Sequence, residues 1–173
     1  MVRFGELRCR QGMLAAWPIV QPHLAELQPR DLAAVIWAAS AIPKPPREVV
    51  LQVEDAALML APRLRELPEK DLPQHLYHCI YGLARFSGGD GSRDFRRSAE
   101  RFVEPMLQGR RPCPLAPSQL VRLLWALARL GCRQAEIFRA LELHLRDAIS
   151  EFSDRELEAL YRILTDLGLN AQS

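Results

Sequence analysis

Apolar residues spaced as on one face of a helix occur in four similar runs along the chain. The runs are LAAVIWAASAI at 32–42, LYHCIYGLARF at 76–86, LVRLLWALARL at 120–130 and LEALYRILTDL at 157–167. When the first Leu of each run is position zero, apolar residues recur at positions zero, three, four, seven and ten. This spacing is typical of the buried face of an α-helix. The pattern therefore predicts four similar helices.

A second helix is expected after each of the first three runs. The expected second helices span roughly Arg47–Leu60, Asp94–Leu107 and Gln134–Ile149. Proline stands three residues before position zero at Pro29, Pro73 and Pro117, where it suits the first turn of a helix. The runs start 44, 44 and 37 residues apart, a period typical of stacked helical hairpins.

The predicted fold is all-α, an α-solenoid that forms a single helical-repeat domain over residues 1–173. It contains a half-repeat at 13–28, full repeats at about 29–72, 73–116 and 117–152, and a C-terminal capping helix at 153–168. The segment SGGDGS at 87–92 is expected to be an exposed loop because glycine is costly inside a helix. Ser153 and Glu156 have the spacing of a capping box at the start of the last helix.

Composition narrows the class of protein. Hydrophobic residues make up 49% of the chain and charged residues 25%, which is typical of a folded globular protein. No apolar run has the length of about 20 residues that spans a bilayer. The four cysteines are widely spaced and suit a reducing compartment. The opening MVRFGELRCRQG is basic and acid-poor, which weakly resembles a mitochondrial presequence.

The positive charge is carried by arginine, because only Lys44 and Lys70 are lysines among 23 basic residues. Arginine binds phosphate with two parallel hydrogen bonds and stacks on bases. This bias indicates either a nucleic-acid partner or the codon usage of a GC-rich genome.

Positions two and nine point away from the predicted buried face at about 100° per residue. In the middle runs these positions are occupied by His78, Arg85, Arg122 and Arg129, and Arg162 at position five of the last run could extend the row. A second basic group contains Arg93, Arg96, Arg97, Arg101, Arg110 and Arg111. Such rows could bind phosphates and stack bases without a fixed base code. A solvated face or a protein contact is the alternative.

Position five holds Trp37, Tyr81 and Trp125 in the first three runs, and these aromatic residues are expected in the core. His78 and Cys79 lie close to His75, but Cys79 occupies an apolar position, so we expect no metal site. No nucleophile elbow, phosphate loop or HExxH motif is present. We therefore expect no enzymatic activity and no cofactor.

The pattern P-x-x-L-x-x-[LVC]-[LI]-[WY]-[AG]-[LA]-A-[RA]-[LFI], with WALARLG at 125–131, resembles the octotricopeptide and heptatricopeptide repeats. It is also similar to the repeats of FAST-kinase-like and RAP-domain proteins. The resemblance covers roughly residues 29–168. It implies an α-solenoid that binds RNA in mitochondria or chloroplasts.

The resemblance, together with the outward-pointing arginines, leads us to expect a non-catalytic, organellar RNA-binding protein. The resemblance implies an rRNA-associated subunit of a mitochondrial ribosome, with the chloroplast as the alternative location. The expected partners are RNA, ribosomal rather than messenger, and other protein subunits of a large complex. Neither a membrane nor a small-molecule substrate is expected. The competing hypothesis is a protein-only scaffold that holds a partner in the groove of the solenoid.

Overall fold

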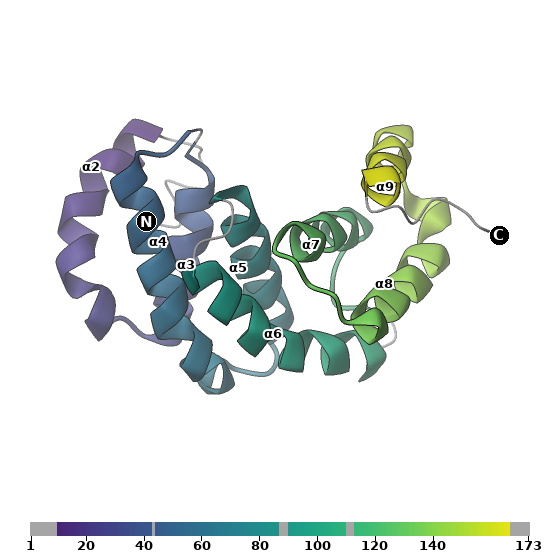
Figure 1. Cartoon of the computed structure of the whole chain (residues 1–173), viewed down its shortest axis with the longest axis horizontal. Helices are drawn as coiled ribbons and strands as arrows, with labels where there is room; N and C mark the ends of the chain where they lie inside the picture. Colours follow the sequence, from purple (N-terminus) through teal and green to yellow (C-terminus); the bar gives the residue numbers. More distant parts are fainter. Residues whose placement is uncertain (1–9, 43, 87–89, 110–112, 167–173) are drawn as a thin grey trace.

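The computed structural model describes residues 10–42, 44–86, 90–109 and 113–166 (Figure 1). These residues form α-helices joined by short turns and 3-10 helices, with no strand among them. The α-helices are α2 (Arg10–Val20), α3 (Pro29–Ser40), α4 (Arg47–Leu60), α5 (Leu72–Phe86), α6 (Asp90–Gly109), α7 (Pro117–Arg129), α8 (Ala135–Asp147) and α9 (Asp154–Asp166). The 3-10 helices are η1 (Gln21–Glu26), η2 (Ala61–Glu66) and η3 (Ile149–Glu151). The all-α prediction is confirmed.

The four predicted runs form α3, α5, α7 and α9. In the first three runs, the residues at positions zero, three, four, seven and ten are all buried, as predicted. Pro29 begins α3 and Pro117 begins α7, each at the first helical position, where its missing N–H leaves no hydrogen bond unmade. α9 differs because none of its residues is fully buried.

The helices are arranged in two rows. α5 packs between α3 and α7, and α7 also contacts α9, so the helices of the four runs lie side by side. The second helices form the other row, in which α6 packs between α4 and α8. Figure 1 shows the elements following one another along an arc from α2 to α9. Apolar surface is therefore buried between neighbouring helices all along the arc.

The start of α6 corrects one prediction. Asp90, Gly91 and Ser92 are helical, and Gly91 and Ser92 are buried, although the segment from 87 to 92 is predicted to be an exposed loop; residues 87–89 lie outside the described residues. Glu54 on α4 explains the difference, because its carboxylate accepts hydrogen bonds from the backbone N–H of Ser92, at 2.6 Å, and from the Ser92 hydroxyl. The first N–H groups of a helix have no partner within the helix, and a carboxylate can accept hydrogen bonds from them.

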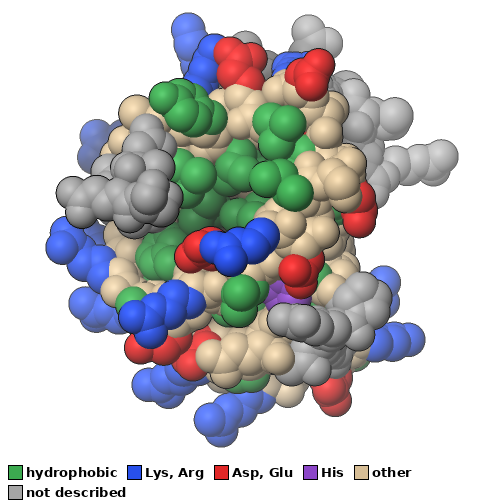
Figure 2. Space-filling model, turned by 90° about the vertical axis from the view of Figure 1, so that its right-hand side faces the viewer, with side chains coloured by type: hydrophobic (Ala, Val, Ile, Leu, Met, Phe, Trp, Pro, Cys, Tyr) green, Lys and Arg blue, Asp and Glu red, His purple; other side chains and the backbone are tan. Residues whose placement is uncertain are grey.

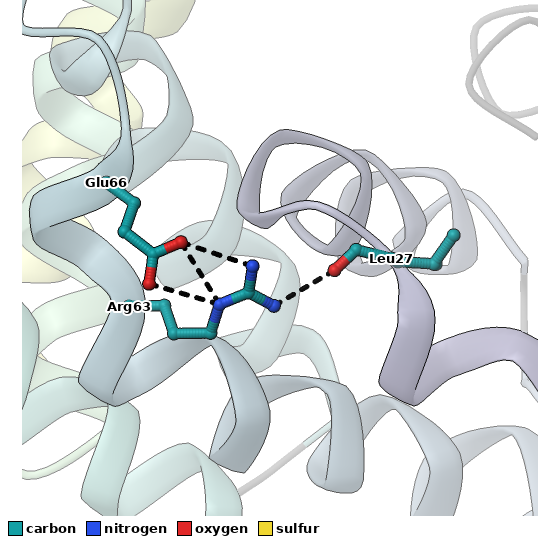
Figure 3. A network of polar contacts seen from close by, with 3 residues as sticks. All are labelled: Leu27, Arg63 and Glu66. Carbon is teal, nitrogen blue, oxygen red and sulfur yellow. Dashed lines mark hydrogen bonds and ion pairs between the residues drawn. The ribbon is translucent and has the colours of Figure 1, made fainter.

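Two of the 3-10 helices, η1 and η2, are similar in sequence. η1 follows α2 and η2 follows α4, and the segments QPHLAEL at 21–27 and APRLREL at 61–67 have the same order of Pro, Leu, Glu and Leu. Arg63 joins the two segments, because its Nη1 donates to the Leu27 carbonyl oxygen at 2.9 Å while Nη2 lies 3.2 Å from Glu66 (Figure 3). Each of the two segments thus contains a 3-10 helix that directly follows an α-helix.

The start of α9 follows the predicted capping box in part. The Glu156 carboxylate accepts hydrogen bonds from the Ser153 backbone N–H at 2.9 Å and from the Ser153 hydroxyl at 2.7 Å. In a full capping box, the Ser153 hydroxyl would accept a hydrogen bond from the backbone N–H of Glu156. Here the hydroxyl instead donates to the Glu156 carboxylate.

None of the described helices combines the length and the apolar character needed to cross a bilayer.

Candidate nucleic-acid interface

Rings and guanidinium groups form a continuous row across α3, α5 and α7. We call it the aromatic–arginine row, and its members are Trp37, His78, Tyr81, Arg122, Trp125 and Arg129. The rings of the row are half-buried, and the two arginines are exposed. The row lies on the surface formed by the first helices, because each member belongs to one of the helices of the predicted runs.

His78, on α5, lies at the end of the row that is nearest to α3, where it contacts Trp37. Its ring stacks on Trp37 with 4.2 Å between the centroids and 17° between the planes. Burial, and then the charge of His75, lowers the pKa of His78 to about 4. The Gln74 amide lies 2.8 Å from its Nε2. His78 is therefore neutral at neutral pH and offers a ring rather than a positive charge to a ligand.

Tyr81 links α5 to α7. Its ring centroid lies 5.8 Å from that of Trp125, and the Arg122 guanidinium carbon lies 5.9 Å from the Tyr81 centroid. Tyr77 lies beneath the row, buried and parallel to Tyr81 at 5.9 Å. Burial raises the pKa of Tyr77, and hydrogen bonding to Arg122 opposes that rise. Arg122 is thus held against two tyrosines while remaining exposed.

Arg129 ends the row on α7. Its guanidinium carbon lies 5.4 Å from the Trp125 ring centroid. Its Nε donates a 2.7 Å hydrogen bond to the carbonyl oxygen of Ala84, in the last turn of α5, where helical carbonyls lack partners. Arg129 therefore contributes to the packing of α7 on α5 as well as to the exposed surface.

Arg85 and Arg162, the other members predicted for this face, are both exposed. Arg85 lies on α5 next to Ala84, which Arg129 contacts. Arg162 lies on α9 and forms an ion pair with Glu158, one turn earlier, which lowers its net attraction for a phosphate. The structure brings His78, Arg122 and Arg129 into one row and leaves Arg162 in an ion pair on a separate helix.

Arg96 and Arg97, two described members of the second basic group, form ion pairs. Arg96 forms an ion pair with the buried Glu100, and Arg97 lies 3.6 Å from Asp94. Arg110 and Arg111 lie outside the described residues. Paired guanidinium groups attract phosphate less than free ones, so we place the candidate site on the aromatic–arginine row.

Trp37, Tyr81 and Trp125 are predicted to lie in the core; the structure leaves all three half-buried within the row, with Tyr81 and Trp125 packed against the core. Position five lies about 60° from position two and about 40° from position nine at 100° per residue. The sequence therefore contained a signal for this grouping. Tyr77, at position one, lies in the layer beneath the row and is not among the residues that the sequence predicts for the site.

Chemically, the row offers half-buried rings for stacking and exposed guanidinium groups for phosphate. Cys79 is buried on α5, and burial raises the pKa of its thiol. Within the described ranges, no group of three or more His, Cys, Asp or Glu side chains could hold a metal ion.

Comparison of the chain with models of protein families, with curated protein sequences and with solved structures finds no match in any of the three.

Proposed function

We propose that the protein is a non-catalytic RNA-binding protein of an organelle, built as an α-solenoid of stacked helical hairpins. The two rows of helices, and the 3-10 helices that follow α2 and α4, support the repeat arrangement. The proposed site is the aromatic–arginine row together with Arg85.

The single observation that carries this proposal is that rings and guanidinium groups lie side by side in the row, with Arg122 over Tyr81 and Arg129 over Trp125. Single-stranded nucleic acids are bound by rings that stack on bases and by cations that contact the backbone. Arg122 and Arg129 each lie over a ring of the row, so stacking and phosphate contacts can occur side by side.

The resemblance of the repeated helix to octotricopeptide-like repeats supports the remaining parts of the proposal. They are a mitochondrial location, with the chloroplast as the alternative, and a role as a subunit that binds ribosomal RNA in the mitochondrial ribosome.

Fluorescence anisotropy with labelled single-stranded and structured RNA tests the proposal. The triple variant Arg85→Glu, Arg122→Glu and Arg129→Glu should lose binding by more than tenfold, because three phosphate contacts become repulsive. The matched control reverses the exposed Arg47, Arg65 and Arg139, which lie on other elements, and should bind within about threefold of the wild type. Circular dichroism establishes that each variant is folded. Equal losses in both triple variants would contradict the proposed site.

A second candidate function, a protein scaffold, is favoured by exposed apolar residues at the last helices. Leu143, Ile149, Leu157 and Tyr161 are exposed on α8, η3 and α9, and Tyr161 is 66% exposed. Figure 2 shows apolar side chains gathered around a hollow on this end of the molecule. Exposed apolar patches commonly mark protein interfaces. Native purification with and without nuclease treatment separates the two functions, because a scaffold keeps its partners after nuclease treatment.

A further inference from the structure

An open cavity of about 210 Å³, in wide contact with solvent, lies between α7 and α9 at the end of the aromatic–arginine row. It is lined by Trp125, Ala128, Arg129, Ile163 and Asp166. Its volume is below the roughly 300–1,000 Å³ of pockets that hold drug-sized ligands. The cavity therefore suits a small flat group, such as one base, rather than a larger molecule.

Part of the lining is apolar, and this part comes from both helices. Trp125 and the small Ala128 line it from α7, and Ile163 lines it from α9; all three side chains are half-buried. An aromatic wall binds a flat heteroaromatic ring by stacking, whatever the base. The walls thus select a base-like shape but do not distinguish one base from another.

Two charged side chains complete the lining. Asp166 is exposed, and its carboxylate has no hydrogen bond or ion pair among the described residues. Arg129 uses its Nε to bind the Ala84 carbonyl, whereas its terminal nitrogens have no acceptor in the described part of the chain. The cavity therefore offers an acceptor-only group and a donor-only group to the same ligand.

The carboxylate distinguishes between the bases. Guanine presents two adjacent donors, N1–H and the N2 amino group, which match the two oxygens of a carboxylate. Adenine, cytosine and uracil each place an acceptor beside the donor on this edge, and that acceptor repels a carboxylate. The O6 and N7 atoms of guanine are acceptors, a pair that arginine binds well. We propose that the cavity between α7 and α9 binds one guanine base of a single-stranded RNA, with Trp125 stacking on it and Asp166 reading its Watson–Crick edge.

This inference rests on the proposed RNA-binding function, and the test separates the two. Oligouridine RNAs of about ten nucleotides, a length within the range of single-strand sites, carry one central guanosine, inosine, adenosine or uridine. The guanosine RNA should bind at least about tenfold more tightly than the uridine RNA, as expected for one bidentate pair. Inosine lacks the N2 amino group and should give an intermediate affinity.

Asp166→Asn should abolish the preference for guanosine while leaving the affinity for the uridine RNA within about threefold. Asp154→Asn removes the same charge from the exposed first turn of α9 and should keep the preference. Measurable binding without a preference for guanosine, or a preference that survives Asp166→Asn, overturns the guanine site and leaves RNA binding intact. Absence of binding to all four RNAs overturns both the guanine site and the proposed function.

Discussion

The guanidinium of Arg129 lies over the indole of Trp125, one turn earlier on α7, with 5.4 Å between the guanidinium carbon and the ring centroid. Side chains that point away from the buried face of a helix are expected to contact solvent only. Arg129 is exposed but also packs on the half-buried Trp125. The same side chain also caps α5 through the Ala84 carbonyl. The proposed interface is thus preorganised by contacts within the protein, which reduces the cost of ordering it on binding.

Arg129→Ala should lower the free energy of unfolding by about 1–2 kcal/mol, since it removes a cation–π contact and a charged hydrogen bond. Arg85→Ala is the matched control because Arg85 is exposed on the same surface, and its effect should stay within about 0.5 kcal/mol. Urea unfolding followed by circular dichroism measures both values. Equal effects would show that Arg129 does not support the packing of α7 on α5.

Glu54→Ala should destabilise the protein by about 2–3 kcal/mol, because the buried N–H and hydroxyl of Ser92 lose a charged acceptor. The neighbouring Asp55 is exposed, so Asp55→Ala should change stability by less than about 0.5 kcal/mol. Chemical denaturation of the two variants tests this difference. A Glu54→Ala protein as stable as Asp55→Ala would contradict the assigned cap of α6.

Gly91 and Gly131 should respond differently to the same substitution. A Cβ atom at Gly91 would lie 2.2 Å from the Glu54 carbonyl oxygen, whereas a Cβ at Gly131 meets nothing within 4 Å. Gly131 has φ 77°, a conformation that asparagine tolerates better than most residues. Gly91→Asn should therefore cost about 1–3 kcal/mol or more, and Gly131→Asn should cost less than about 1 kcal/mol. Thermal unfolding ranks the two, and the reverse order would contradict the close approach of α6 to α4.

His78 should make stability depend on pH. Its pKa in the folded protein is lowered to about 4 from the ordinary value of 6.5, so the unfolded chain binds the proton more tightly. The contribution of neutral His78 to the free energy of unfolding is complete above about pH 6.5. It is lost as the pH falls from about 6.5 toward 4. The urea midpoint of the wild type should therefore fall between about pH 7 and pH 5 more steeply than that of His78→Gln. If the urea midpoints of the wild type and of His78→Gln change with pH in parallel, His78 is not kept neutral by its burial against Trp37.

The helices and their buried faces could be predicted because apolar periodicity is local. Leu76, Leu83 and Leu120 are buried at their predicted positions. The start of α6 could not be predicted, since its glycines favour a loop and the stabilising acceptor, Glu54, precedes Ser92 by 38 residues. Such distant contacts leave no periodic signal.

The candidate site was predictable to a smaller extent. The helical spacing places Arg122 and Arg129 on one face, but it does not show that Arg129 reaches the Ala84 carbonyl on another helix. Nor does it show that His78 stacks on Trp37, since both contacts depend on how closely α3, α5 and α7 approach one another. Gly82 contributes to this approach, because a Cβ there would lie 3.3 Å from the Ile36 carbonyl oxygen.

The salt dependence of RNA binding tests the central claim most directly. If Arg85, Arg122 and Arg129 each neutralise one phosphate of a single strand, the logarithm of the association constant should fall with the logarithm of salt concentration with a slope of about −2. Each single change to glutamine at these positions should reduce the slope by about 0.7, and Arg47→Gln should leave it unchanged. A slope near zero, or a slope that the three variants share with the wild type, would contradict RNA binding by the aromatic–arginine row.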